Sequence, residues 1–241
     1  MFLEAFRSTG INYICNNFKV LERKIIKTAD GSSSLYLPQW DENYHSRHGA
    51  IQEAYHVFIH SGLDLFKEGS EVSILEMGFG TGLNCFISFL ESQKRDLQIE
   101  YVGLEGYPLD IELIKELKYP EALKALDMMT FYNQIIGSEW DTRVKISSGF
   151  ELLKRHVMFE EFDGSQDFDL IYFDAFGARV QPELWTETIF AKMYVSLRPG
   201  GILVTYSAKG SVRRAMKAVG FEVERLPGPP GKREMLRGRK L

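Results

Sequence analysis

The sequence predicts an α/β fold, a doubly wound and mostly parallel seven-stranded sheet with a β-hairpin extension on its N-terminal side. Two observations carry this prediction. A strand, a glycine-rich turn and a helix start follow one another in VSILEMGFGTGLN, residues 72–84. From residue 72 onward, strand-like and helix-like patterns alternate, which is typical of parallel strands joined by helices. The 241 residues, 44% of them hydrophobic, suffice for one such domain and an extension.

The segment before the glycine-rich turn predicts the extension. In residues 18–37 two β-rich runs flank Asp30 and Gly31, a dipeptide that favours a hairpin turn. Residues 51–58 carry apolar side chains at helical spacing, and Gly62 stands where a helix would end. We therefore expect an N-terminal extension over residues 1–68, packed on a core domain over residues 69–241.

The core domain is expected to alternate strands and helices and to end in an antiparallel pair. The predicted strands are 72–76, 98–105, 143–147, 168–176 and 202–207, and the closing pair is 221–226 with 232–238. The predicted helices begin near residues 83, 108, 120, 150, 182 and 210.

The glycine-rich turn indicates a ligand site. Gly78, Gly80 and Gly82 follow the strand at intervals of two, and glycine suits such a turn because it adopts positive φ and lets the backbone approach a ligand. The turn differs from two known phosphate-binding patterns. Leu83 stands where a dinucleotide fingerprint has its third glycine, and Leu83 and Asn84 replace the Lys and Ser or Thr of a phosphate loop.

The string Glu-x-Gly-x-Gly-x-Gly is instead similar to motif I of the class I S-adenosylmethionine-dependent methyltransferases. This resemblance implies the fold of that class and S-adenosyl-L-methionine as cofactor. The cofactor contacts implied by the motif are Glu76, Gly78, Phe79, Gly80 and Gly82.

Polar residues at strand ends extend this site, because doubly wound sheets bind ligands outside the carboxyl ends of their strands. Glu105 ends the second strand, where an acid accepts hydrogen bonds from ribose hydroxyls. Ser148 follows the predicted third strand. Many similar methyltransferases have an Asp there that accepts from the adenine amino group, so Ser148 is the candidate for the adenine contact.

Asp174 is the candidate catalytic residue. It ends an almost wholly apolar strand. Methyl transfer requires alignment, and an amine nucleophile must in addition lose a proton, which a carboxylate accepts. Capping of the next turn is the alternative role. Methylation of a pyrimidine ring carbon would need a thiol in the pocket, and Cys85 lies in a predicted helix instead.

Charge is distributed unevenly. Residues 209–241 hold ten Lys or Arg against three Glu, in a chain with a net charge of −4. Such a segment predicts either a localised polyanion-binding face or a solvated terminus. The two cysteines, Cys15 and Cys85, make no disulfide framework, and no early apolar run reaches the length of a signal peptide or membrane span. We therefore expect a cytoplasmic protein with no membrane partner.

Two further patterns have a structural and a functional interpretation. His56 and His60 have a metal-ligand spacing, but the intervening residues lack the Glu of a zinc-protease helix and no third ligand is evident, so no metal is expected. Several aromatic residues are candidates either for stacking on a base or for the core. These are Tyr36, Trp40, Tyr44, Phe176, Trp185 and Tyr206.

Six strings together resemble one family, the methyltransferase domain of MnmC, which takes part in making 5-methylaminomethyl-2-thiouridine in tRNA. The strings are ADGSSSLY, Tyr44 to Glu53, LEMGFGTGLN, FDAFGARVQPELWTETIF, RPGGILVTYSAKGSVRRAMKAVGF and GKREML. The resemblance implies methyl transfer to the exocyclic amine of 5-aminomethyl-(2-thio)uridine at the wobble position, so that the tRNA anticodon stem-loop is the partner.

The resemblance also implies roles for residues outside the glycine turn. Asp174 and Phe176 would lie beside the substrate, and the stretch from Tyr44 to Glu53 would close over the site. The implied phosphate contacts are Arg213, Arg214, Lys232 and Arg233.

The chain departs from the two-domain members of this family. No second glycine fingerprint is present and nothing follows residue 241, so we expect a stand-alone methyltransferase without FAD. Its amine substrate would then come from another enzyme or be installed directly. The alternatives are a methyltransferase or aminopropyl transferase acting on another amine, and a non-catalytic RNA-binding module of the same fold. The sequence does not indicate an oligomeric state.

Overall fold

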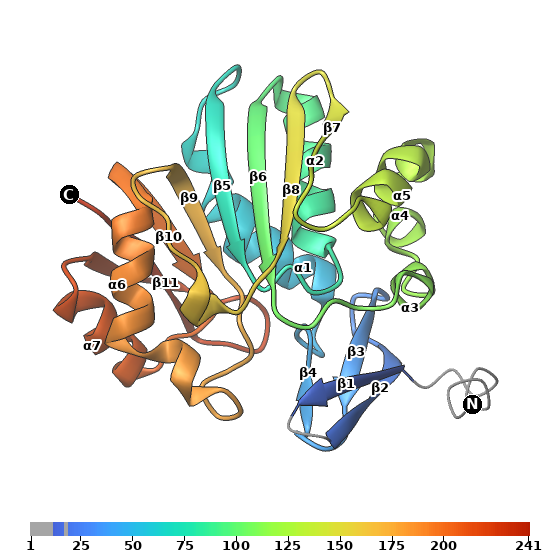
Figure 1. The fold of residues 1–241 in the computed structure, drawn as a ribbon, viewed down its shortest axis with the longest axis horizontal. Helices are drawn as coiled ribbons and strands as arrows, with labels where there is room; N and C mark the ends of the chain where they lie inside the picture. The colour runs from blue at the N-terminus through green and yellow to red at the C-terminus, as the bar shows by residue number, and fades with distance from the viewer. Residues whose placement is uncertain (1–11, 17–18) are drawn as a thin grey trace.

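The computed structural model describes residues 12–16 and 19–241, which form two sheets with helices on both faces of the larger one. Figure 1 shows the smaller sheet lying below the carboxyl ends of the main strands. Among the described residues, no helix has both the length and the apolar character needed to cross a membrane.

The smaller sheet is antiparallel and has the strand order β1-β2-β3-β4. Its strands are β1 Asn12–Asn16, β2 Lys19–Lys27, β3 Ser33–Leu37 and β4 Glu42–Asn43. The predicted hairpin is confirmed as β2 and β3, although residue 18 lies outside the described residues. Asp30 Oδ1 holds the turn because it accepts from Thr28 Oγ1 and from the Ser32 amide at 2.7 and 3.0 Å.

The larger sheet has the order β11-β12-β10-β9-β5-β6-β8-β7 in the described residues. Five of its strands are parallel: β5 Glu71–Met77, β6 Gln98–Glu105, β8 Phe150–His156, β9 Phe168–Phe173 and β10 Leu197–Thr205. Three strands are antiparallel to their neighbours: β7 Arg143–Ser147 at one edge of the sheet, and β12 Glu234–Arg239 and β11 Glu222–Pro227 at the other, with β11 outermost. The doubly wound α/β fold and the closing antiparallel pair are therefore confirmed.

Side chains on the two faces of this sheet enter different cores. On β5, Val72 and Ile74 pack with one group of helices, whereas Leu75 and Met77 pack with the other. The first group comprises α1 Ala50–Ala54 with its π-helical continuation Tyr55–His60, α2 Leu83–Arg95, α3 Ile111–Lys115, α4 Tyr119–Ala122 and α5 Met129–Gly137. The second group comprises α6 Glu187–Ser196 and α7 Gly210–Ala218. Short 3-10 turns lie at Leu63–Leu65, Leu126–Met128, Phe159–Glu161 and Pro182–Trp185.

The prediction of a helix from Phe150 is wrong, and so is the count of seven strands. Residues 150–156 form β8, which pairs with β6 in parallel and with β7 in an antiparallel hairpin, giving eight strands in the described sheet. Phe150, Leu152 and Lys154 point to the same buried face. Lys154 hides the alternation, because this buried lysine donates to the Ile136 carbonyl at 2.8 Å and lies 4.8 Å from the Trp140 ring centre.

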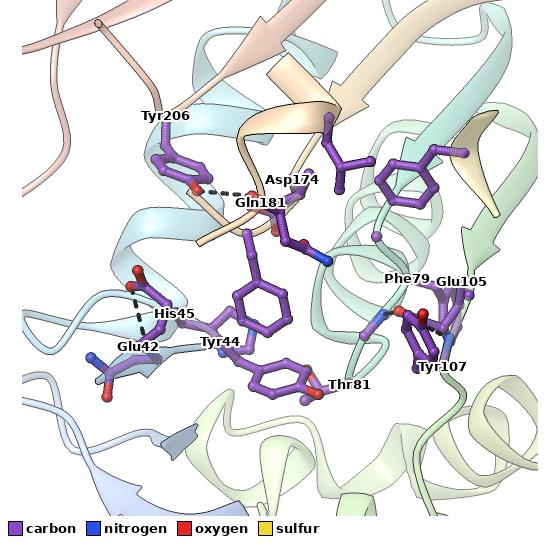
Figure 2. Close-up of a pocket in the computed structure, with 18 of the residues that line it drawn as sticks. Glu42, Tyr44, His45, Phe79, Thr81, Glu105, Tyr107, Asp174, Gln181 and Tyr206 are labelled. Carbon is purple, nitrogen blue, oxygen red and sulfur yellow. Dashed lines mark hydrogen bonds between the residues drawn. The ribbon is translucent and has the colours of Figure 1, made fainter. Parts of the chain in front are cut away.

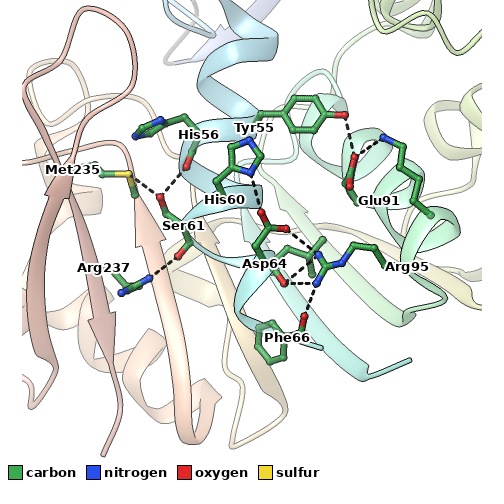
Figure 3. Close-up of polar contacts among 12 residues, drawn as sticks. Tyr55, His56, His60, Ser61, Asp64, Phe66, Glu91, Arg95, Met235 and Arg237 are labelled. Atoms are coloured by element: carbon green, nitrogen blue, oxygen red, sulfur yellow. Dashed lines mark hydrogen bonds and ion pairs between the residues drawn. The ribbon is translucent and has the colours of Figure 1, made fainter. Parts of the chain in front are cut away.

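Polar contacts hold the π-helical segment Tyr55–His60 in place, and Figure 3 shows two of them, from the Tyr55 hydroxyl to Glu91 of α2 and between His60 and Asp64. His56 Nε2 lies 2.8 Å from the carbonyl oxygen of Pro227, whereas His60 Nδ1 lies 2.8 Å from Asp64 Oδ2. The two histidines therefore have different partners, and the structure does not bring them together as ligands of one ion. Among the described residues, no group of three His, Cys, Asp or Glu could hold a metal.

Candidate active site

A cavity of about 420 Å³ lies between the two sheets, at the carboxyl ends of β5, β6 and β9. Its walls come from the turn after β5, from the ends of β6 and β9, and from residues 40–46, which include β4 and lead from the smaller sheet toward α1. Figure 2 shows Tyr44, Glu105 and Asp174 among the side chains that line this cavity, with Glu105 and Asp174 in different parts of its wall. Because this is the edge at which doubly wound sheets bind ligands, it is the candidate active site.

The three glycines of the turn have the conformation predicted for them. Gly78, Gly80 and Gly82 have φ angles of +98, +51 and +74°. A Cβ atom on Gly78 would lie 2.8 Å from the carbonyl oxygen of Asp174, so the turn passes too close to β9 for a side chain. The amides of Gly78 and Phe79 both donate to the Leu104 carbonyl on β6, which fixes the turn across two strands.

We expect Gly78→Ala to destabilise the fold by roughly 1–3 kcal/mol, because the new methyl group combines a contact with backbone and a strained positive φ. The midpoint of chemical denaturation measures this loss. Gly137→Ala, at the end of α5, is the matched control because nothing lies within 4 Å of its Cβ position. Equal midpoints for Gly78→Ala and the parent protein would contradict the expectation.

Glu105 presents a carboxylate to the cavity from the end of β6. Its two oxygens accept from the Gly80 and Tyr107 amides at 2.9 and 2.8 Å. Burial raises the pKa of Glu105, whereas the two hydrogen bonds from these backbone amides lower it. An ionised carboxylate offers about four acceptor positions, so two remain for donors in the cavity. This arrangement fits the neighbouring hydroxyls of a ribose.

A buried amide links two more acids behind the turn. Asn84 Nδ2 donates to Glu76 Oε1 and to Asp174 Oδ2, each at 2.9 Å. Glu76 is 1% exposed, also accepts from the Tyr101 hydroxyl, and does not line the cavity. The prediction that Glu76 contacts a cofactor directly is therefore wrong, because its carboxylate does not reach the cavity. The carboxylate orients Asn84 instead.

Asn84 has one side-chain acceptor without a protein donor in the described part of the chain. Its Oδ1 is buried and has no hydrogen-bond partner among the described residues, and the residue lines the cavity. A buried acceptor without a donor is costly, so a bound donor would satisfy it. The amino group of a methionine-derived cofactor has this chemistry, and S-adenosyl-L-methionine therefore fits the glycine turn, Asn84 and Glu105 together.

Asp174 lies where β9 ends and faces the cavity. Burial raises the pKa of its carboxyl group well above the usual range, and the negative charge of Glu53 adds to that effect. The Asn84 hydrogen bond and the positive charge of Lys232 act in the opposite direction. A carboxylate of this kind binds a proton more readily than an exposed Asp, which suits a general base.

Lys232 enters the same cavity from the loop between β11 and β12. Its Nζ lies 2.7 Å from Glu53 Oε1 and 3.8 Å from the Tyr206 ring centre. Glu53, on α1, also accepts from the Ser46 amide at 2.7 Å. The structure thus pairs Lys232 within the protein, which disfavours the phosphate contact predicted for it.

Aromatic side chains form the wall beside residues 40–46. The Phe176 ring lies 4.9 Å from Tyr44 and 5.7 Å from Trp40, both edge to face. Arg23 is 3% exposed and donates through Nε to the Tyr44 hydroxyl at 3.3 Å. Of the aromatic candidates from the sequence, Trp40, Tyr44, Phe176 and Tyr206 line the cavity. Trp185 is a core residue, and Tyr36 lies outside the cavity with Arg47 over its ring.

Ser148 does not belong to this site. It lies in the turn between β7 and β8, at the end of the sheet where the parallel strands begin, because β8 and not β7 runs parallel to β6. The residues that follow β8 reach the cavity instead, and they are Met158, Phe159 and Glu160. The signal in the sequence that could have found them is the spacing of the apolar residues Phe150 and Leu152, two positions apart, which favours a strand over a helix.

The remaining predicted residues lie apart from the cavity or only border it. Phe79 lines it, yet its ring is buried against Trp140 at 5.9 Å. Arg213 and Arg214, on α7, and Arg233, whose side chain is 90% exposed, do not line it. Any contact of these arginines with a ligand would therefore be made outside the cavity.

Acids dominate the charged residues of the cavity wall. Its described lining carries one lysine, Lys232, but no arginine and no cysteine. The acids of the lining are Glu42, Glu53, Glu105, Glu160, Asp174 and Glu183. Such a lining favours a cationic ligand, and an amine that arrives protonated is one.

The sequence is similar to a family of methyltransferases and to named relatives. Residues 141–241 match a family model described as S-adenosyl-L-methionine-dependent methyltransferase. A protein from Cupriavidus metallidurans, "tRNA 5-methylaminomethyl-2-thiouridine biosynthesis bifunctional protein MnmC", is 30% identical over 224 residues, which covers 83% of this chain and 31% of that protein. The protein of the same name from Cupriavidus necator is 31% identical over 217 residues, covering 83% and 32%. The chain spans about a third of the length of these relatives.

Two solved structures share the fold. MNMC2 from Aquifex aeolicus superimposes with a TM-score of 0.67 at 24% identity, covering 90% of this chain and 70% of that one. Spermidine synthase from Thermotoga maritima has a TM-score of 0.55 at 13% identity, covering 95% and 78%.

Proposed function

Because the chain belongs to the family of S-adenosyl-L-methionine-dependent methyltransferases that includes the corresponding part of the MnmC proteins, we propose that it methylates an amine on tRNA. The substrate would be the exocyclic amine of 5-aminomethyl-(2-thio)uridine at the wobble position, and the product 5-methylaminomethyl-(2-thio)uridine. The observation that carries this proposal is the acid-rich cavity in which Asp174 lies beside the glycine turn. The family assignment does not favour the alternative of aminopropyl transfer.

Different residues of the cavity would bind different parts of the cofactor. The backbone of Gly78 and Gly80, the Glu105 carboxylate and Asn84 Oδ1 would hold the cofactor, whose sulfonium supplies an activated methyl group when bound. Met158 and Glu160 would lie at the adenine end, since they follow β8. Residues 69–241 would form the methyltransferase domain, with residues 1–68 as an extension that supplies part of the cavity wall.

Asp174 would then act on the substrate amine. It accepts a proton from the ammonium group, which leaves a lone pair on nitrogen. The nitrogen attacks the methyl carbon as the carbon–sulfur bond breaks and its electron pair returns to sulfur. S-adenosylhomocysteine and a protonated secondary amine result, and the protein's main contribution is to hold nitrogen and methyl carbon in line. Phe176 and Tyr44 would pack against the uracil ring at the cavity mouth.

The arginines outside the cavity would bind the tRNA backbone. Arg213 and Arg214 lie in the first half of α7, the helix that follows β10, and Arg233 is on the β11–β12 loop that also carries Lys232. A cytoplasmic location would bring the protein together with its tRNA. We propose the anticodon stem-loop as the partner, because a wobble uridine lies there.

We expect the double substitution Arg213→Ala and Arg214→Ala to weaken tRNA binding and to leave cofactor affinity unchanged. Counterion release predicts that the logarithm of the affinity falls with the logarithm of salt by roughly 0.7–0.9 per phosphate neutralised, so the variant's slope should also be smaller. Filter binding over a range of salt concentrations measures both effects. Arg143→Ala, on the edge strand β7, is the control. Equal slopes for the parent protein, the double variant and the control would count against these contacts.

The direct test of the function is a reaction with natural substrate. Purified protein and S-adenosyl-L-methionine are incubated with tRNA from cells that lack this protein, and the nucleosides are analysed by mass spectrometry. We expect 5-aminomethyl nucleosides to gain one methyl group. Binding of tRNA without any methyl transfer would support a non-catalytic RNA-binding module. Calorimetric binding of the decarboxylated cofactor, but not of S-adenosyl-L-methionine, would support aminopropyl transfer.

A further inference from the structure

We propose that Lys232 is a positioning residue that balances the charge of Glu53, so that Asp174 stays ionised until the substrate amine delivers its proton. The inference rests on the proposed function for its link to methyl transfer. It assigns to Lys232 an internal role in the cavity in place of contact with the tRNA backbone.

The first observation is the geometry of the ion pair. Lys232 Nζ lies 2.7 Å from Glu53 Oε1, and the Glu53 side chain is only 10% exposed. The second Glu53 oxygen accepts from the Ser46 amide, so the carboxylate is fixed between the β11–β12 loop and the segment before α1. The Lys232 ammonium also lies over the Tyr206 ring, which holds it on the cavity side.

The second observation is the charge that surrounds Asp174. Glu53 from α1 and Lys232 from the β11–β12 loop act on its carboxyl group with opposite sign. Tyr206 faces it from the end of β10, and Glu76 on β5 reaches it through the Asn84 amide. Further titratable groups lie around this pair: His45 feels the charges of Glu53 and Asp30, Tyr206 feels that of Glu42, and His48 lies beside Gly231, next to Lys232 in the chain. Lys232 is the single Lys or Arg residue in the described cavity wall.

The consequence follows from Coulomb's law. With Lys232 present, the Glu53 charge is neutralised at contact distance and Asp174 interacts with an ion pair. Without Lys232, two carboxylates with no counter-ion share a poorly hydrated site, and ionising both becomes unfavourable. One of them then keeps a proton to higher pH, and Asp174 loses its ability to accept one from the substrate.

The test compares Lys232→Met with a matched control and two rescue variants. Lys67→Met, an exposed lysine near the amino end of β5, is the control for removing a lysine. Single-turnover methyl transfer is measured as a function of pH. We expect the acid limb of the profile to move to higher pH by about one unit in Lys232→Met. The positive charge of Lys232 lowers the pKa of Asp174, and loss of a nearby opposite charge shifts a carboxyl group by roughly one to three units. Lys232→Arg and the double variant Lys232→Met/Glu53→Gln should restore the parent position.

A second readout does not depend on activity. The carboxyl carbon of Asp174, assigned by comparison with Asp174→Asn, is titrated by ¹³C NMR in the protein without substrate. We expect its apparent pKa to rise in Lys232→Met and to return in the double variant. If the rate falls equally at every pH and the NMR titration does not move, Lys232 only holds its loop and the proposal is overturned. If the NMR titration moves as expected but the parent protein methylates no tRNA, the proposed function fails and the charge balance stands.

Discussion

Replacing Asp174 with Asn should lower the rate of methyl transfer by roughly 10²–10⁴-fold, which is the usual contribution of a general base. The amide has the same shape and can still accept from Asn84 Nδ2, so cofactor affinity should change little. Only the acceptor for the ammonium proton is lost. Rapid-quench measurement of the first turnover reports the rate, and calorimetry with S-adenosyl-L-methionine reports the affinity.

The same substitution should not destabilise the fold at neutral pH. Burial raises the pKa of Asp174 above that of the unfolded chain, so its contribution to stability is present below the unfolded value of 3.8 and is lost as pH rises through the folded value. A neutral Asn removes this loss, and its unfolding midpoint should equal or exceed that of the parent protein. Asp127→Asn, at an exposed position, is the control. A rate within threefold of the parent, with the fold intact, would exclude Asp174 as the base.

Replacing Glu105 with Gln should weaken S-adenosyl-L-methionine binding by roughly 10–10²-fold. A hydrogen bond to a charged group contributes about 1.5–3 kcal/mol, and the ribose hydroxyls would lose the ionised acceptor. The Gln side chain also brings an NH₂ group toward the amides of Gly80 and Tyr107, which now donate to the two carboxylate oxygens. Isothermal calorimetry measures the change directly.

The control for this variant is Glu100→Gln, on the same strand and exposed to solvent. The methyl-transfer rate at saturating cofactor should fall much less than the affinity, because Glu105 does not contact the reacting atoms in the proposed mechanism. Unchanged affinity in Glu105→Gln would show that the ribose is held elsewhere.

The fold was largely predictable because its main signals are local. The Asp30–Gly31 turn and the alternation of strands and helices need no knowledge of distant contacts, and both predictions are confirmed. The β7–β8 hairpin was missed because Lys154 occupies a core position of β8, where a charged residue interrupts the apolar alternation expected of a strand. Its ammonium is satisfied by Ile136 and Trp140, which only the folded structure brings to it.

The candidate site was predictable at strand ends and not beyond them. Glu105 and Asp174 line the cavity because each ends a parallel strand, and their chemical roles stay predictions. Ser148 was assigned to the site because β7 was expected to be a parallel strand, whereas β7 is antiparallel and its end lies away from the cavity. The setting of Lys232 could not be read from the sequence, since a lysine in a basic segment carries no local sign that Glu53 and Tyr206 surround it.

The contact between Glu53 and Lys232 joins residues 179 positions apart in the chain. A ribosome releases the N-terminal part of a protein first, so α1 and the glycine turn emerge well before the loop that completes this wall. A nascent chain would therefore contain the glycine turn before the cavity wall is complete. The proposed methyl transfer would begin only after the β11–β12 hairpin had emerged and packed against α1.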